Sequence, residues 1–206
     1  MAKQERAVRT RESLIRSAAE IFDREGFTVA SLAMISTQAG VSSGALHFHF
    51  ASKAALAEAV ESAALDRLRI IAGVASREGA GRLQYLVDVT HGLALGLRRD
   101  VVLRAGFGLG GEAGRVTPGD LREHWRQWVE QAVAEAEKAG ELRPGVAPED
   151  AVTAVVAATV GFEVLGSREE AWLAPRTIAR FWELLLPALA AGDRLAALEP
   201  EGSSDG

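Results

Sequence analysis

The 206-residue chain has no cysteine and only 6% aromatic residues. Without cysteine it can form neither a disulfide framework nor a thiolate metal site, which fits a reducing compartment. The longest uncharged apolar run, residues 151–162, is too short to cross a bilayer, and the charged first residues lack the apolar segment of a signal peptide. We therefore expect a cytoplasmic protein with no membrane partner.

The sequence also lacks a recognisable set of catalytic residues or metal ligands. No Ser/His/Asp or paired-carboxylate grouping converges in it. His47 and His49 lie two positions apart, and on a helix this spacing places them roughly 200° apart, on opposite faces. We expect no catalytic residue, no metal and no cofactor, and we do not expect an enzyme.

What is present favours helix. Ala, Leu, Val, Glu and Arg dominate, and strand signals are scarce. The charge is divided unevenly along the chain. Residues 1–56 carry seven Lys and Arg against five acidic residues, whereas the rest of the chain carries sixteen against twenty-three. A basic head on an acidic body suggests two regions with different roles, although a solvated, arginine-rich first helix would give the same pattern.

The head has the pattern of a helix-turn-helix. After an amphipathic stretch over residues 10–25, Ser31 and Ser42 can each cap a short helix, and Gly40 can end the first of the two. Two short helices joined by a three- to four-residue turn that contains glycine are typical of this motif. Ser52 can cap a further, long helix that would link the head to the body.

The body shows only helical patterns. We therefore predict an all-α protein, in which a three-helix helix-turn-helix head is joined by a long helix to a helical body. The predicted domains are residues 1–56, a head that the family resemblance described below assigns to DNA binding, and residues 57–198, a body that the same resemblance assigns to ligand binding and dimerisation. Residues 199–206, which are polar and acidic, are expected to form a disordered tail.

Small residues mark a candidate contact surface at the start of the third helix. Ser43, Gly44 and Ala45 have little bulk, so a backbone can approach another molecule closely there. Helix starts at Ser42 and Ser52 offer free N–H groups, and Lys53 adds a charge, an arrangement that suits phosphates on either side of a major groove. We expect His49 to be an ordinary structural side chain whose hydrogen bonds are made within the protein. We expect His47 to lie on the contact surface.

The stretches TRESLIRSAAEIFDREGF and SLAMISTQAGVSSGALHFHFASKAALAEAV resemble the DNA-binding head of the TetR family of bacterial repressors, over about residues 9–60. In that family the third helix reads a palindromic operator and the lysine that opens the fourth contacts phosphate. Position 43, often lysine in the family, is Ser43 here, and position 47, often tyrosine, is His47. The resemblance implies a double-stranded operator as partner, a nucleoid-associated location and this set of DNA-binding residues: Ser31, Thr37, Gln38, Ser42, Ser43, Gly44, Ala45, His47, Phe48 and Lys53.

Family members are homodimers, which agrees with the spacing of half-sites in a palindrome. The last two helical patterns, residues 151–166 and 177–192, are the candidate dimer helices. The first is rich in small and β-branched residues, and the second carries an apolar stripe. Packing within one chain would explain both patterns equally well.

A small-molecule pocket is suggested by aromatic and polar residues within apolar helices, although ordinary core packing accounts for the same pattern. Residues 40–60, the later tryptophan-containing helix and GSREEAWLAPRTIARFWELLLPAL resemble the γ-butyrolactone autoregulator receptor branch. Those repressors control antibiotic production and release DNA on binding a butyrolactone, butenolide or furan signal. In that branch a tryptophan on the helix of Trp128 covers the ligand and a threonine resembling Thr159 hydrogen-bonds it. The candidate ligand-binding residues are Tyr85, Phe107, Trp125, Gln127, Trp128, Gln131, Thr159 and Phe162.

Three other interpretations remain open on the sequence. A multidrug or metabolite sensor beside an efflux gene would share the head and differ only in its ligand. An orphan repressor would keep the fold without a signal. A helical enzyme or carrier with an incidental helix-turn-helix is the least consistent with the sequence, since no nucleophile–base pair is evident.

Overall fold

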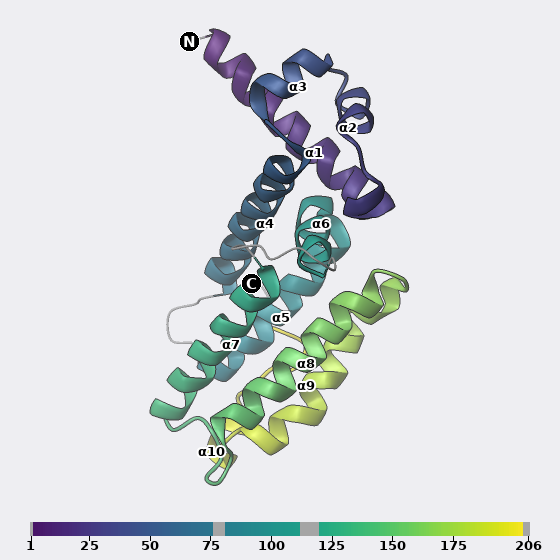
Figure 1. Ribbon diagram of the computed structural model, residues 1–206. Coiled ribbons are helices and arrows are strands. Elements are labelled where there is room, and N and C mark those ends of the chain that lie inside the picture. The colour runs from purple at the N-terminus through teal and green to yellow at the C-terminus, as the bar shows by residue number, and fades with distance from the viewer. Residues whose placement is uncertain (1, 76–80, 112–119, 204–206) are drawn as a thin grey trace. The chain divides into compact units, whose positions relative to one another are not determined.

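The computed structural model describes residues 2–75, 81–111 and 120–203 and is built from helices (Figure 1). Within these ranges the backbone forms no strand, and its extended pairing is limited to one isolated antiparallel bridge between Leu142 and Ala190. The predicted all-α class is confirmed. In the same ranges, no helix combines the length and apolar character that a membrane crossing requires.

The chain divides into two compact units that differ from the predicted division at residue 56. The first unit, the head unit, joins residues 1–67 to residues 100–121, and the second, the body unit, joins residues 68–99 to residues 122–206. The difference arises because α6 (Val101–Gly110), far along the chain, packs on α1 (Ala2–Val29). The helix that follows the helix-turn-helix, α4 (Lys53–Ala75), contributes residues to both units.

The head unit begins with α1, α2 (Leu32–Gln38) and α3 (Ser43–His49). The serines predicted as caps start the short helices: the hydroxyl of Ser31 accepts the Met34 N–H and that of Ser42 accepts the Ala45 N–H, each at 3.2 Å. Between the two helices, Gly40 has a φ of 65°, a left-handed conformation that suits glycine. Apolar side chains from these helices and α4 form one core: Leu14, Ala18, Phe22, Ile35, Leu46 and Leu56.

Helix α6 completes the head unit. The guanidinium of Arg104 donates to the Asp23 carboxylate on α1 at 3.1 Å. At Gly106 the α6 backbone lies so close to α4 that an added Cβ would fall 2.3 Å from the Ala64 Cβ and 3.3 Å from Leu121 Cδ2. A side chain at Gly106 would therefore require α6 to move, because backbone and core atoms cannot overlap.

The body unit consists of α5 (Arg82–Arg99), α7 (Leu121–Lys138), α8 (Pro148–Gly166), the 3₁₀ helix η1 (Glu170–Leu173), α9 (Pro175–Leu189) and α10 (Gly192–Leu195). Pro148 and Pro175 each open a helix, where their missing N–H has no intrahelical partner. Helices α8 and α9 lie side by side (Figure 1), with the rings of Phe162 and Phe181 5.5 Å apart. The buried apolar residues of α5, α8 and α9 form the core of this unit.

The end of the chain differs from the predicted disordered tail. Residues 199–203 hydrogen-bond to α5: Gln84 exchanges two bonds with the Glu199 backbone, of 2.8 and 3.2 Å. The Asp88 carboxylate accepts the N–H and the hydroxyl of Ser203 at 2.8 and 2.9 Å. The polar composition suggested disorder because these partners lie 115 positions away and are not visible in local sequence. Residues 204–206 lie outside the described part of the chain.

Candidate functional site

The first candidate site is the outer face of the helix-turn-helix. The cap at Ser42 starts α3, and Leu46 anchors the helix in the head core. This orientation leaves Ser43, Gly44 and His47 exposed, together with Phe48, whose side chain is 81% exposed. We call Ser42, Ser43, Gly44, Ala45, His47 and Phe48 the α3 surface.

An exposed phenylalanine of this degree is unusual on a soluble protein. The ring of Phe48 contacts the half-buried His49 edge-on, with centroids 5.1 Å apart. The small residues beside it keep the helix backbone accessible. The α3 surface is therefore suited to close contact with a large partner, and the predicted DNA-binding residues of α3 all lie on it.

The predicted residues on α2 have local hydrogen bonds. Ser31 caps the helix, and the Thr37 hydroxyl donates to the Ala33 carbonyl at 2.9 Å. The Gln38 amide donates to Glu20 on α1 at 2.8 Å. Thr37 and Gln38 are exposed, so both can still meet a partner, whereas the hydroxyl of Ser31 is engaged with its own helix.

Lys53 is placed differently from its predicted role as a phosphate contact. Its ammonium group donates to the backbone carbonyls of Phe27, Thr28 and Ala30 at 2.7, 3.3 and 2.8 Å. It also lies 4.4 Å from the centroid of the Phe27 ring. All three ammonium protons are thus directed at the end of α1. Lys53 joins the start of α4 to α1, and in this conformation no proton of it remains for a phosphate.

The second candidate site is a cavity in the body unit between α5, α8, η1 and α9. It has a volume of about 10 Å³, which is room for roughly one water molecule. Its walls are mainly apolar, and its lining residues are Thr90, Leu93, Ala94, Leu97, Thr159, Phe162, Leu173 and Ile178.

Two threonine hydroxyls supply the polar atoms of the lining. Thr159 Oγ1 lies 2.8 Å from the Val155 carbonyl, and Thr90 Oγ1 lies 2.6 Å from the Leu86 carbonyl. Behind the wall, the fully buried Trp125 donates its indole N–H to Thr159 Oγ1 at 2.7 Å. Apolar walls with a few placed polar groups are typical of small-molecule sites.

The predicted ligand-binding residues are only partly brought together. Thr159 and Phe162 line the cavity, and Trp125 contacts it through Thr159. Gln127 and Gln131 are exposed and bond to glutamates of their own helix, so the structure places neither of them in the cavity lining. They lie on the side of α7 opposite its buried residues, such as Trp125 and Val129.

The remaining three predicted residues are not part of the lining. Phe107 is buried in the head unit, not in the body unit that contains the cavity. Tyr85 and Trp128 are half-buried. Burial raises the pKa of the Tyr85 hydroxyl, an effect that the nearby positive charge of Arg82 partly opposes.

Several residues of the cavity were missed by sequence reasoning. Thr90, Leu93 and Leu97 belong to α5, whose apolar stripe was recognised, but nothing local distinguishes a cavity wall from ordinary core. Trp182 lies in residues 177–192, the second candidate dimer helix. Its side chain is completely buried, and it is the one described residue whose buried side-chain polar atom, the indole nitrogen, has no hydrogen-bond partner.

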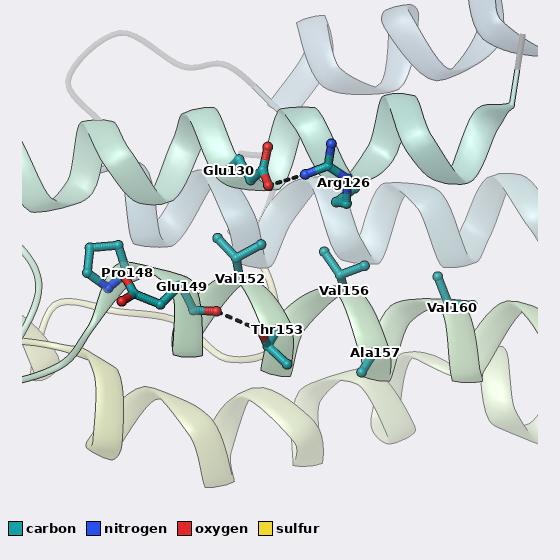
Figure 2. A pocket seen from close by; sticks show the side chains of 9 residues that line it. All are labelled: Arg126, Glu130, Pro148, Glu149, Val152, Thr153, Val156, Ala157 and Val160. Carbon is teal, nitrogen blue, oxygen red and sulfur yellow. Dashed lines mark hydrogen bonds and ion pairs between the residues drawn. The ribbon is translucent and has the colours of Figure 1, made fainter. Parts of the chain in front are cut away.

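A larger, open groove of about 680 Å³ lies between α7 and α8 (Figure 2). Val152 and Val156 point from α8 toward α7, which contributes the ion pair of Arg126 and Glu130. A hydrogen bond from Arg126 is also the main reason why the pKa of Glu123 is lowered to about 2. None of the predicted ligand residues lines this groove, so the internal cavity is the better match to the sequence-based site.

Metal ligation has no support in the part of the chain that the structure describes, because no group of three or more His, Asp or Glu side chains there could hold an ion. His47 and His49 share α3, and one is exposed while the other is half-buried.

Comparisons with known proteins identify relatives of both the head and the whole chain. A sequence model described as "Bacterial regulatory proteins, tetR family" matches residues 14–60, which include the α3 surface. The A-factor receptor protein of Streptomyces griseus is 32% identical over 209 residues, which cover 100% of this chain and 72% of the relative.

Solved structures extend the similarity to both units. A gamma-butyrolactone receptor, described as an ArpA-like protein, is 30% identical with a TM-score of 0.81, over 93% of this chain and 94% of that one. CprB from Streptomyces coelicolor, in complex with its biological operator sequence, is 32% identical with a TM-score of 0.78, over 93% and 94% of the two chains. Our chain belongs to the tetR family of bacterial regulatory proteins, and within that family it resembles the gamma-butyrolactone receptors.

Proposed function

We propose that this protein is a transcriptional repressor that binds a palindromic operator as a homodimer and is released by a small diffusible signal. The observation that carries the proposal is the α3 surface, on which small residues and the 81% exposed Phe48 lie together at the outer face of a helix-turn-helix. The operator complex of the similar CprB supports it. The proposed location is the cytoplasm, at the nucleoid, and the proposed target is control of antibiotic production.

The α3 surface is proposed to enter the major groove. Ala45 and Phe48 offer apolar contacts of the kind that thymine methyl groups accept, and His47 offers ring nitrogens to base edges or phosphates. Thr37 and Gln38 would position α2 on the sugar-phosphate backbone of the DNA. With few charged side chains on this face, we expect a shallow dependence of operator affinity on salt.

The dimer is proposed to form through α8 and α9. Large apolar side chains are exposed on these two helices: Val164 and Leu165 on α8, and Leu184 on α9, which is 82% exposed. Water-exposed leucine of this extent on a helix with a buried opposite face favours a partner surface. Leu184→Glu should give a monomer with its helix content intact, measured by light scattering and circular dichroism, whereas a dimer in that variant would place the interface elsewhere.

The cavity is proposed to bind the signal, with a butyrolactone, butenolide or furan as the chemical class. Its apolar walls suit an alkyl chain, and Thr90 and Thr159 suit an oxygenated ring. The names of the A-factor receptor and of the gamma-butyrolactone receptors support this class. A multidrug or metabolite sensor, or an orphan repressor without a signal, remains the alternative.

The size of the cavity supports a mechanism for release. A volume of about 10 Å³ holds no signal molecule, so binding would require α5, α8 and α9 to separate. The signal would thereby favour a conformation in which the two heads of the dimer no longer match the half-sites. A coupling of about 1–3 kcal/mol would lower operator affinity by one or two powers of ten. We propose that the continuous helix α4 transmits this movement to the head.

The proposal is tested by a gel shift with DNA from upstream of the protein's own gene. We expect a complex that disappears when extract from the producing culture, or a synthetic γ-butyrolactone, is added. Retention of the complex with all lactones, butenolides and furans would contradict the signal class. Absence of any complex would contradict autoregulation, and random-sequence selection would then determine whether the protein binds DNA at all.

A further inference from the structure

Trp182 lies on α9 with its side chain completely buried and its indole nitrogen without a hydrogen-bond partner. A buried donor of this kind destabilises the unliganded protein, since the N–H has lost water and gained nothing. Other buried side-chain polar atoms in the described ranges are paired. The unpaired N–H is therefore an exception among the described residues.

The position of Trp182 connects it to the cavity. Ile178 lines the cavity, and Trp182 follows it one helical turn later on the same buried face of α9. Long side chains on a helix lean toward its N-terminus, over the preceding turn, which for Trp182 is the turn that contains Ile178. Trp182 also contacts the ring of its sequence neighbour Phe181, with 5.1 Å between centroids, and Phe181 contacts the cavity residue Phe162.

The polar groups of the cavity wall accept but do not donate. A backbone carbonyl can only accept, so the short contacts of Thr90 with Leu86 and of Thr159 with Val155 fix both hydroxyl protons on their own helix. The N–H of Trp125 is already given to Thr159. A ligand hydroxyl would find free lone pairs on the two threonines, but a ligand carbonyl would find no donor there.

We propose that the indole N–H of Trp182 is the donor that binds the ring carbonyl oxygen of the lactone signal. This inference rests on the proposed function, because it assigns a role within the same site. When α5, α8 and α9 separate to admit the ligand, the carbonyl oxygen approaches the ring next to Ile178, and the N–H gains its first partner. Ligand binding thus removes an unfavourable feature of the unliganded state, which adds to the affinity.

The same chemistry predicts how the ligand is oriented. The carbonyl end points toward α9, while a hydroxyl on the ligand donates to Thr90 or Thr159 on α5 or α8. Specificity for a lactone over a cyclic ether then depends on Trp182, since a site with a buried unpaired donor discriminates against a ligand that leaves it unpaired.

The first test is direct and uses the wild-type protein. The chain contains four tryptophans, so the ¹⁵N-labelled protein gives four indole cross-peaks, which are assigned by elimination with Trp125→Phe, Trp128→Phe and Trp172→Phe. The probe is 2-(1-hydroxyhexyl)-γ-butyrolactone. We expect the Trp182 cross-peak to move downfield as the N–H acquires an acceptor.

The second test measures a coupling. Affinity for the lactone and for 3-(1-hydroxyhexyl)tetrahydrofuran, in which a CH2 group replaces the carbonyl, is measured by calorimetry in wild type and in Trp182→Phe. In wild type the lactone should bind on the order of tenfold more tightly than the ether. In Trp182→Phe this preference should be lost, and Trp172→Phe, which changes an exposed tryptophan, should retain it.

The outcomes separate this inference from the repressor function. If the lactone releases operator DNA but the Trp182 cross-peak stays in place and both proteins prefer the lactone equally, the role of Trp182 is overturned and the repressor function stands. If the lactone neither binds nor releases DNA, lactone sensing is wrong and this inference falls with it. The cross-peak experiment uses the wild-type protein, so it tests the role of Trp182 even if Trp182→Phe fails to fold.

Discussion

The indole N–H of Trp125 on α7 donates a 2.7 Å hydrogen bond to the hydroxyl of Thr159 on α8. Thr159 in turn donates to the Val155 carbonyl of its own helix at 2.8 Å. A residue of the cavity wall is therefore held in place by a side chain behind it, so a ligand that displaces Thr159 must also disturb the packing of α7.

Trp125→Phe should keep most of the ring packing and remove this bond. We expect the free energy of unfolding to fall by about 1–3 kcal/mol, from the lost bond and the smaller ring. Urea denaturation measures the effect, and Trp172→Phe, at an exposed position, serves as the matched control. A Trp125→Phe protein as stable as the control would show that the bond adds nothing to stability.

Lys53→Met should destabilise the head rather than weaken phosphate binding. Methionine retains the aliphatic stem but leaves the carbonyls of Phe27 and Ala30 without their donor, so we expect a loss of about 1–3 kcal/mol in unfolding free energy. The slope of log affinity for the operator against log salt should stay the same. A decrease of about one in that slope, with unchanged stability, would restore the phosphate role.

Phe48→Ala should lower operator affinity by at least about tenfold, as expected for loss of a well-packed interface aromatic. Its ring is 81% exposed in the free protein, so the melting temperature should change little. Fluorescence anisotropy with labelled operator measures the affinity. Ile70→Ala, which changes an exposed apolar side chain on α4 outside the head unit, should leave operator binding unchanged.

Truncation after Leu198 should destabilise the body unit. Gln84 is only 8% exposed and pairs with the backbone of Glu199, so removal of residues 199–206 leaves a buried amide without that partner. We expect a loss of about 1–3 kcal/mol, measured as a lower melting temperature. Glu201→Ala, at an exposed position of the same segment, is the control. An unchanged melting temperature in the truncated protein would mean that the docked segment contributes no stability.

Arg104→Met should alter the response to the signal more than binding to DNA. The pair of Arg104 with Asp23 joins α6 to α1 within the head unit and is partly exposed, so its loss should cost less than about 1 kcal/mol of stability. If α6 transmits the effect of the ligand within the head unit, the lactone concentration that releases half of the bound operator DNA should be severalfold higher in the variant than in wild type. Loss of operator binding without ligand would assign the pair to the head structure instead.

Much of the fold was predictable because its signals are local. Ser31 and Ser42 cap the helices that their sequence positions predict, and Gly40 takes the left-handed conformation between them. Ser43, Gly44 and Ala45 were singled out by the same local reasoning, whereas His47 and Phe48 came from the family resemblance.

The expectations that differ from the structure have two causes: contacts between distant segments, and a helical phase that was not used. Lys53 has partners 23 to 26 positions earlier, and the terminal segment has partners 115 positions earlier, so neither role was visible in a sequence window. Gln127 and Gln131 were placed in a pocket because they are polar within an apolar helix. The helical phase of Trp125, Val129 and Ala132 places both glutamines on the solvent side, and this signal was available in the sequence.

The close approach of α6 to α4 at Gly106 also constrains how this protein can diverge. A methyl group there would overlap Ala64 and press on Leu121, so a larger residue at position 106 is tolerated only if one of the others becomes smaller or shifts. Positions 64, 106 and 121 should therefore vary together among relatives that keep this helix spacing. A lineage that acquires alanine at position 106 alone should show a displaced α6, and with it an altered threshold for its signal.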